Sequence, residues 1–359
     1  MSLYIHIPFC HNICSYCDFC KQLYNETNVN KYLTALENEI KDRYNNEELE
    51  SIYIGGGTPS ALSFLQLKKL FNILRILRTN KLKEFTFECN VNDITEELIK
   101  LLKNNGVNRL SIGIESFNKE KLKFMERYAE YNDVKNKIKM IKEVGINNIN
   151  IDLIYGIPEE TLKILKKDIK YFLKLKPNHI STYSLILEEY TKLSIKNIQP
   201  INEELELKMY NYIRKKLKQK KYIHYEISNF SLTGCESIHN LKYWNNLEYY
   251  GFGLGSHGYI DGIRYENTKN FNKYIENIYV NKQEIVGIRE KQENELMLGL
   301  RKIKGININE FYNKYKVKIE DVFPIKPLLK NKDLIYKNGN IFINPDKLYI
   351  MNEILLKLI

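Results

Sequence analysis

Three cysteines near the start of the chain have a spacing that suits an iron–sulfur cluster. Cys10, Cys14 and Cys17 follow one another as C-x3-C-x2-C directly after a short apolar run. One loop of this kind can place three thiolates at three corners of a cubane and leave the fourth iron open for a small ligand. A structural zinc site is the alternative, although it usually brings two cysteine pairs separated by a longer insert. We predict a [4Fe–4S] cluster on these three residues.

The other cysteines fit a reduced protein. Of the six cysteines, four lie between Cys10 and Cys20, whereas a disulfide framework would spread them along the chain and need an oxidising compartment. Cys20 is either a fourth cluster ligand or a small buried residue. We favour the second interpretation, because three ligands are already present.

Further polar and glycine-rich segments stand where strands are expected to end. The segment Gly55-Gly56-Gly57-Thr58-Pro59-Ser60 follows a predicted strand, and glycines let a ligand approach the backbone closely. Taken alone, it is equally well explained as a tight turn. Glu88 ends another predicted strand and on its own could be a solvated carboxylate. Arg127 and Asp152 could form a simple ion pair.

One histidine lies among flat aromatic side chains, in the sequence His239-Asn240-Leu241-Lys242-Tyr243-Trp244. A neutral imidazole can ligate heme iron axially, and Tyr243 and Trp244 offer apolar surface for a porphyrin. A single histidine beside aromatic residues is more often a packed core residue. His224 and His257 are weaker candidates for a heme ligand.

Together these motifs resemble the radical-SAM superfamily. The C-x3-C-x-Y-C loop and the wider segments Leu3–Cys10 and Cys17–Phe19 are similar to the branch that holds oxygen-independent coproporphyrinogen III dehydrogenase and its relative, the heme chaperone HemW. The resemblance runs from residue 2 to about residue 305. It implies that one electron from the reduced cluster cleaves S-adenosyl-L-methionine (SAM) to a 5′-deoxyadenosyl radical.

The resemblance also assigns the SAM site. The glycine segment matches a GGGTP motif that holds the amino group, Glu88 matches a ribose-binding carboxylate, and Asp152 matches a DLMYGLP motif. Glu115 stands where the family usually has glutamine, and Glu126, beside Arg127, stands where glycine is usual. The SAM-binding residues implied are Tyr4, Tyr16, Gly56, Gly57, Thr58, Glu88, Glu115, Arg127 and Asp152.

Three features favour a heme chaperone over the dehydrogenase. Phe19 stands where the dehydrogenase has a fourth cysteine, and the chain begins nine residues before Cys10, without the extension that helps to close that enzyme's active site. The third feature is the HNxxYW motif of HemW, which implies heme binding by His239, Asn240, Tyr243 and Trp244. The enzymatic alternative is oxidative decarboxylation of porphyrinogen propionates. A third hypothesis is a protein that holds cluster and SAM but has lost heme handling.

Strand and helix patterns alternate along the first part of the chain, which predicts an α/β fold with parallel strands in a partial (β/α)6 barrel. Its chemistry is expected at the C-terminal ends of the strands. The predicted strands are Ser2–Ile7, Ser51–Ile54, Glu84–Cys89, Arg109–Ile112, Ile149–Ile154 and His179–Leu185. The predicted helices are Val29–Tyr44, Leu65–Leu77, Glu96–Asn105, Asp133–Val144, Thr161–Leu175 and Glu203–Lys220, with N-caps at Asn28, Thr95 and Asn132 and stops at Gly106 and Gly145.

Three regions are expected. Residues 1–230 form the barrel with the cluster and SAM site, residues 231–287 hold the HNxxYW segment and a linker, and residues 288–359 form a small helical, winged-helix-like domain. In the last region, Lys337-Asn338-Gly339-Asn340 predicts a tight hairpin turn.

Charge and hydropathy set limits on partners and location. The net charge is +11, but the lysines are scattered over helix faces and no nucleic-acid module is evident, so no nucleic acid is expected. No apolar run reaches the ~18 residues of a membrane span. We expect a cytoplasmic protein with some affinity for the surface of anionic membranes. The resemblance implies heme-accepting respiratory proteins as partners, and a homodimer.

Overall fold

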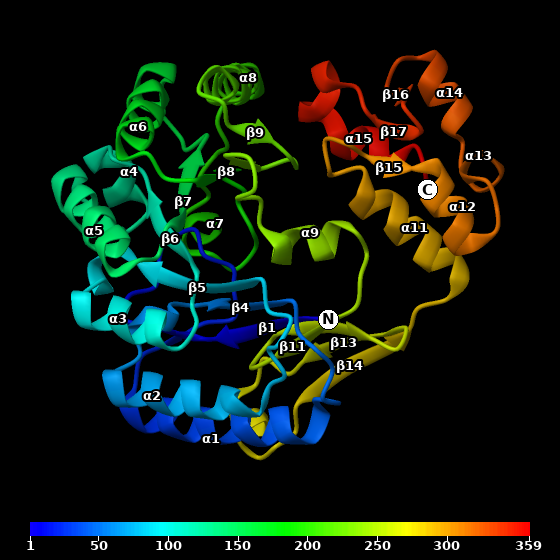
Figure 1. Ribbon diagram of the computed structural model, residues 1–359. Coiled ribbons are helices and arrows are strands. Elements are labelled where there is room, and N and C mark those ends of the chain that lie inside the picture. The colour runs from blue at the N-terminus through cyan, green and yellow to red at the C-terminus, as the bar shows by residue number, and fades with distance from the viewer.

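Six parallel strands form the centre of the molecule. The computed structural model describes residues 1–359, and the strands are adjacent in the order β1, β4, β5, β6, β7 and β8 (Figure 1). All five neighbouring pairs are parallel, which confirms the predicted α/β fold. The strands are β1 (Ser2–Ile7), β4 (Ser51–Gly56), β5 (Glu84–Asn90), β6 (Arg109–Glu115), β7 (Asn148–Tyr155) and β8 (His179–Ser184).

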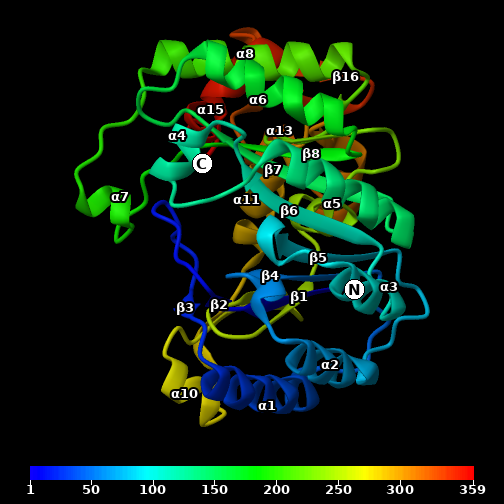
Figure 2. The same ribbon diagram turned by 90° about the vertical axis from the view of Figure 1, so that its left-hand side faces the viewer.

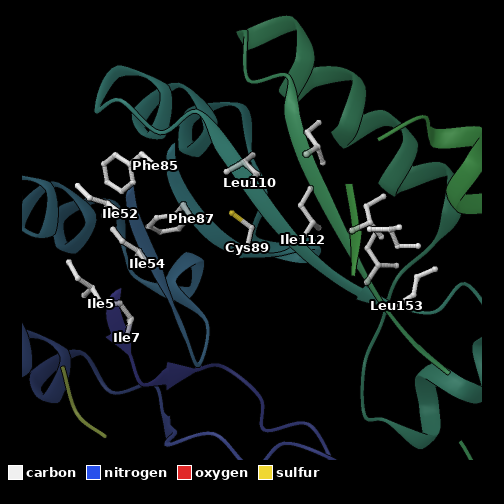
Figure 3. Packing of buried hydrophobic residues seen from close by; sticks show 14 of the residues in the cluster. Ile5, Ile7, Ile52, Ile54, Phe85, Phe87, Cys89, Leu110, Ile112 and Leu153 are labelled. Carbon is white, nitrogen blue, oxygen red and sulfur yellow. The ribbon is translucent and has the colours of Figure 1, made fainter. Parts of the chain in front are cut away.

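Helices connect these strands and cover one face of the sheet (Figures 1 and 2). They are α1 (Glu26–Arg43), α2 (Phe64–Ile73), α3 (Glu96–Asn104), α4 (Lys119–Phe124), α5 (Tyr131–Val144) and α6 (Leu162–Leu175), followed by α7 (Lys192–Ile195) and α8 (Glu203–Gln219). Apolar side chains alternate along each strand, and Figure 3 shows Ile52 and Ile54 beside Phe85 and Phe87 in the buried core. Because side chains alternate between faces, the residues between them point to the other side of the sheet.

The helix ends follow the predicted capping chemistry in part. The Thr95 side chain accepts a hydrogen bond from the N–H of Leu98, and Gly145 ends α5 in the left-handed conformation, with φ 98°, as predicted. The other two predicted N-caps are wrong. Asn25 caps α1, three residues before Asn28, and α5 begins without a side-chain cap, so Asn132 lies inside it. An asparagine can stand just before a helix or within its first turn, so the sequence alone does not show which position is the N-cap.

The residues after α8 extend the sheet at both edges. Strand β8 pairs with β10 (Asn229–Ser231), which pairs with β9 (Ile223–His224). On the other edge, β1 pairs in parallel with β11 (Tyr249–Phe252), and β12 (His257–Ile260), β13 (Ile263–Asn267) and β14 (Val280–Ile285) follow. The expectation of a linker before Gly287 is therefore wrong, because these backbone groups pair in the main sheet. Helix α10 (Phe271–Ile275) packs on α1.

The last part of the chain combines helices with a small sheet. It contains the helices α11 (Ile288–Gly299), α12 (Ile308–Tyr315), α13 (Ile319–Val322), α14 (Ile325–Lys330) and α15 (Met351–Leu356), with the strands β15 (Ile306–Asn307), β16 (Leu334–Lys337) and β17 (Asn340–Ile343). The predicted hairpin is present, because β16 pairs with β17 and Asn338 and Gly339 both have positive φ, as a tight hairpin turn requires. The three domain boundaries remain predictions.

Candidate functional site

The residues predicted for the cluster and for SAM meet in one cavity of about 630 Å³. Most of these residues lie at or near the C-terminal ends of the central strands, where a β/α barrel is expected to place its chemistry. Eleven of the twelve predicted cluster and SAM residues line this cavity, and the exception is Tyr4. Tyr4 lies beside it, with its hydroxyl 3.0 Å from Nδ1 of His6.

The three cysteines of the predicted cluster all line the cavity. Cys10 ends β2 (Phe9–Cys10), and Cys14 and Cys17 lie on the loop that leads from there to β3 (Gln22–Leu23). Helix α7 lies beside this loop (Figure 2), and the Lys192 ammonium donates a 2.9 Å hydrogen bond to the Ile13 carbonyl. The Thr58 hydroxyl lies 3.4 Å from Sγ of Cys10. These thiols form a donor set of the type that an iron–sulfur cluster needs.

Cys20 and Phe19 lie in different surroundings from those three thiols. The Cys20 side chain packs against the hydrophobic core and does not line the cavity, and its carbonyl accepts a 2.7 Å hydrogen bond from the His6 ring. Phe19 lines the cavity but is 62% exposed. The placement of Cys20 favours its interpretation as a small buried residue.

The glycine segment lets the chain pass close to the cluster loop and to Glu88. A Cβ on Gly57 would lie 2.9 Å from Sγ of Cys10 and 2.8 Å from the backbone of Pro8. A side chain at this position would therefore displace the cluster loop. The Glu88 carboxylate accepts hydrogen bonds from the Gly56 N–H at 3.0 Å and from the Tyr53 hydroxyl at 2.6 Å.

Strands β6 and β7 place a second group of charges opposite Glu88. Gly113 on β6 pairs with Asp152 on β7, so the residues around them share one part of the wall. The Arg127 guanidinium donates to the Gly113 carbonyl, lies 3.4 Å from the Glu115 carboxylate and 3.8 Å from Sγ of Cys14. Arg127 thereby connects the SAM-type motifs to the cluster loop.

The site gathers buried carboxylates that are costly to ionise. Burial raises the pKa of Glu88 to about 7, and burial raises the pKa of Glu115 to about 7 against the opposing effect of Arg127. Burial also raises the pKa of Asp152, while hydrogen bonds from Ser181 and Asn150 lower it. Carboxylates in such surroundings stabilise a ligand that carries positive charge. The sulfonium and ammonium groups of SAM are of this kind.

The polar residues that hold these carboxylates in place were not predicted from the sequence. Asn150 Nδ2 lies 2.8 Å from both the Asp152 carboxylate and the Ser111 hydroxyl, and Tyr53 donates to Glu88. Arg109 also lines the cavity. The spacing in the sequence could have identified them. Arg109 and Ser111 are two residues apart on β6, and Asn150 and Asp152 are two residues apart on β7, so the residues of each pair share the inner face of their strand.

The HNxxYW motif forms helix α9 (Ile238–Trp244) at the opposite ends of the strands. His239 is 1% exposed. Its Nδ1 lies 3.0 Å from the hydroxyl of Ser51, the first residue of β4, and its Nε2 lies 2.8 Å from the Tyr243 hydroxyl. Both ring nitrogens are thus engaged, so ligation of heme iron by His239 requires one of these hydrogen bonds to break.

Asn240, Tyr243 and Trp244 lie on the same helix, whereas His224 and His257 lie on the strands β9 and β12. Of the motif, only Asn240 lines the cavity, whereas Tyr243 stacks edge-on against His239 and Trp244 lies under the guanidinium of Arg301. His224 stacks on Phe230 with ring centroids 4.2 Å apart. His257 is exposed at the start of β12.

Comparison with known proteins defines the class. Residues 4–172 match the model of the Radical SAM superfamily, and the cysteine loop and glycine segment described above lie within this range, so the chain is a radical-SAM protein. It is 40% identical over 347 residues to the heme chaperone HemW of Lactococcus lactis, covering 94% of this chain and 91% of that protein. It is 39% identical over 353 residues to HemW of Bacillus subtilis, covering 94% and 93%. The chain belongs to the HemW family.

A solved structure supports the same fold. The coproporphyrinogen III oxidase HemN from Escherichia coli, described as a radical SAM enzyme, superposes with a TM-score of 0.87 over 99% of this chain and 89% of that chain, at 21% identity. At this identity the likeness concerns the fold alone. Within the chain, no helix is both long and apolar enough to cross a membrane.

Proposed function

We propose that the protein is a heme chaperone that holds a [4Fe–4S] cluster and SAM in its central cavity, binds heme and delivers it to acceptor proteins. Membership of the HemW family supports the chaperone role. The observation that carries the cofactor assignment is the convergence of three cysteines, the glycine segment and the buried carboxylates on a single cavity. Respiratory proteins at the membrane are the proposed acceptors.

The proposed cluster ligands are Cys10, Cys14 and Cys17. When bound, the cluster would supply a one-electron donor and an iron with an open coordination position. Gly57 leaves the space that the Cys10 thiolate needs, and Arg127 places positive charge 3.8 Å from the sulfur of Cys14. This positive charge would offset part of the negative charge that a cluster held by thiolates carries.

The proposed SAM site uses the backbone of Gly56, Gly57 and Thr58 with the carboxylates of Glu88, Glu115 and Asp152. Tyr16 and Arg127 border the same space, and Tyr4 supports it from beside the cavity. Their role is to bind and orient a cationic ligand next to the cluster, and the negative charge of the site suits that role.

The heme residues in this proposal come from the family motif, His239, Asn240, Tyr243 and Trp244. Asn240 can contact a ligand in the cavity as it stands. A homodimer, a cytoplasmic location and contact with the membrane surface during delivery are further parts of the proposal, and they follow from the family and from the net charge of +11.

Two measurements on the anaerobically reconstituted protein test the function. We expect heme titration to show saturable one-to-one binding in the Soret band. We also expect no SAM-dependent conversion of coproporphyrinogen III, because the protein would act as a carrier. Conversion of the porphyrinogen would replace the chaperone by the dehydrogenase alternative, and the absence of saturable heme binding would favour a protein without heme handling.

A further inference from the structure

Strand β14 (Val280–Ile285) forms an open edge of the main sheet. It stands at the end of the strand order and pairs only with β13 (Figure 1). All six of its residues are exposed. The backbone N–H and C=O groups on the open side of an edge strand can pair with a strand of another chain.

We propose that β14 pairs with the same strand of a second copy of this chain, antiparallel and with Gln283 on the two-fold axis. The inference rests on the homodimer of the proposed function and adds the surface through which the two copies meet. A two-fold interface uses the same surface of both copies, so each contact occurs twice. In this register, Lys282 lies opposite Glu284 of the partner subunit, and Glu284 lies opposite Lys282 of the partner subunit.

The open side of β14 offers backbone groups at the position that this register needs. Residues of an antiparallel pair alternate between those that exchange both hydrogen bonds and those that exchange none. The Val286 N–H donates to the Gly262 carbonyl, and the ladder with β13 stays regular back to Lys282. Every second residue before Val286 therefore faces β13, and Gln283 directs its N–H and C=O outwards. Two copies of Gln283 can then exchange two hydrogen bonds across the axis.

The charged side chains of β13 and β14 are complementary in this register. Arg264 on β13 lies opposite Glu284, and Glu266 on β13 lies opposite Lys282. Pairing of the two copies continues this order, so positive and negative side chains alternate across four strands. Charged residues on an edge strand ordinarily oppose pairing between copies, whereas opposite charges that face each other favour it.

Charge also selects this register over its neighbours. Outward-facing residues must stay opposite each other, so the next registers differ by two residues along the partner strand. One of them places Lys282 opposite Lys282 of the partner subunit, and the other places Glu284 opposite Glu284 of the partner subunit. Like charges directly opposite each other destabilise a sheet.

Exposed apolar side chains flank the strand at both ends. Ile278 before β14 is 52% exposed, and Ile288 after it is 64% exposed. Because the paired strands run antiparallel, the segment before β14 of one copy would lie beside the segment after β14 of the other. Burial of these isoleucines against the partner would add a hydrophobic contribution to the hydrogen bonds of the edge.

Charge reversal on β14 tests this pairing, with light scattering of the anaerobically reconstituted protein over a dilution series as the measurement. We expect the wild type to be a dimer. Lys282→Glu and Glu284→Lys each place like charges opposite each other and should each weaken the dimer about 10- to 100-fold. An equimolar mixture of these two variants should form a heterodimer, because opposite charges then face each other again. Lys139→Glu, the same change at an exposed position of α5, is the control and should remain a dimer.

Gln283→Pro tests the backbone pairing separately. It removes the outward N–H, and proline is tolerated on an edge strand where that N–H faces solvent. The variant should therefore keep its circular dichroism spectrum and lose the dimer. If the wild type is a dimer that neither the charge reversals nor Gln283→Pro weakens, the inference is overturned although the homodimer stands. A wild type that is monomeric throughout the dilution series would overturn both, while heme titration tests the chaperone role independently.

Discussion

The Glu84 carboxylate, on the first residue of β5, accepts a 2.7 Å hydrogen bond from the backbone N–H of Ile238, the first residue of α9. It also accepts hydrogen bonds of 3.2 Å from the N–H of His239 and from the Ser237 hydroxyl. The first N–H groups of a helix have no partner within the helix. The Ser237 hydroxyl, which accepts from the Asn240 N–H, and Glu84 on a strand of the barrel together cap the helix that carries the HNxxYW motif. The contact with Glu84 holds that helix across the ends of the strands.

We expect Glu84→Gln to lower the free energy of unfolding by about 3 kcal/mol, because it weakens this cap and removes the negative charge next to the buried Arg109. Urea denaturation of the two proteins measures the difference. Glu97→Gln, at an exposed position of α3, is the control and should change stability by less than about 0.5 kcal/mol. Equal stability of Glu84→Gln and the wild type would show that α9 does not depend on this contact.

A buried ion cluster supports the wall of the cavity at Ile154, whose carbonyl accepts a 2.8 Å hydrogen bond from the Lys121 ammonium. The Lys121 ammonium lies 2.7 Å from Glu160 and 3.2 Å from Asp168. Lys121→Met would leave two buried carboxylates unpaired, and we expect a loss of about 3–5 kcal/mol at neutral pH. The control is Lys139→Met, which removes an exposed ion pair and should have little effect.

The effect of Lys121→Met should depend on pH with a definite sign. Burial raises the pKa of Glu160 even in the presence of Lys121, and loss of the lysine would raise it further. The folded variant would then take up protons more readily than its unfolded chain, so the defect should shrink as the pH falls towards about 5. A defect of equal size at both pH values in urea denaturation would contradict this account.

The strands of this fold were largely predictable from the sequence, and the reason is physical. Each of the six central strands combines an apolar outer face with polar inner positions and ends next to a turn. This pattern can be recognised within the few residues of the strand itself. The strands β11–β14 were not predicted, because Tyr249–Phe252 becomes a strand by pairing with Ser2–Ile5, far away in the chain. Such pairing leaves no local signal beyond an aromatic run.

Cluster content should distinguish the three cavity cysteines from Cys20. We expect Cys17→Ala to lose most of the iron and sulfide after reconstitution, because only two thiolate ligands remain. Cys20→Ala should keep both at the wild-type level, since that side chain packs against the core. Iron and sulfide analysis with absorption spectra gives the result. Loss of the cluster in Cys20→Ala would make Cys20 a ligand.

SAM affinity should fall as the pH drops below about 7. Burial holds the pKa of Glu88 at about 7 in the protein without ligand, and a cationic ligand favours the ionised carboxylate and so lowers that pKa. Binding then competes with protonation and weakens by up to about tenfold per pH unit below 7, with a plateau above about 8. Calorimetric SAM titrations of the wild type between pH 6 and 8 measure this dependence.

Glu88→Gln should bind SAM more weakly and largely lose the pH dependence over the same range. Glu188→Gln, which changes an exposed carboxylate at the rim of the cavity, is the matched control and should keep the wild-type pH profile. A pH dependence that is the same in Glu88→Gln and the wild type would show that another group controls the titration.

The sequence located the site better than it located its supporting contacts. Cys10, Cys14 and Cys17 lie within one loop, so their spacing alone brings them together. The burial of His239 between Ser51 and Tyr243 depends on the packing of α9 against distant strands, which the motif does not encode locally.

Transfer of heme to an acceptor is the most direct test of the chaperone role. The reconstituted protein, loaded with one heme, would be mixed anaerobically with membranes that contain a heme-free b-type respiratory enzyme, and the spectra of both fractions would be recorded. We expect the heme lost by the chaperone to appear in the membrane enzyme in equal amount, and to arrive there faster than free heme supplied at the same concentration. Heme that stays on the protein, or that reaches the enzyme no faster than free heme, would contradict it.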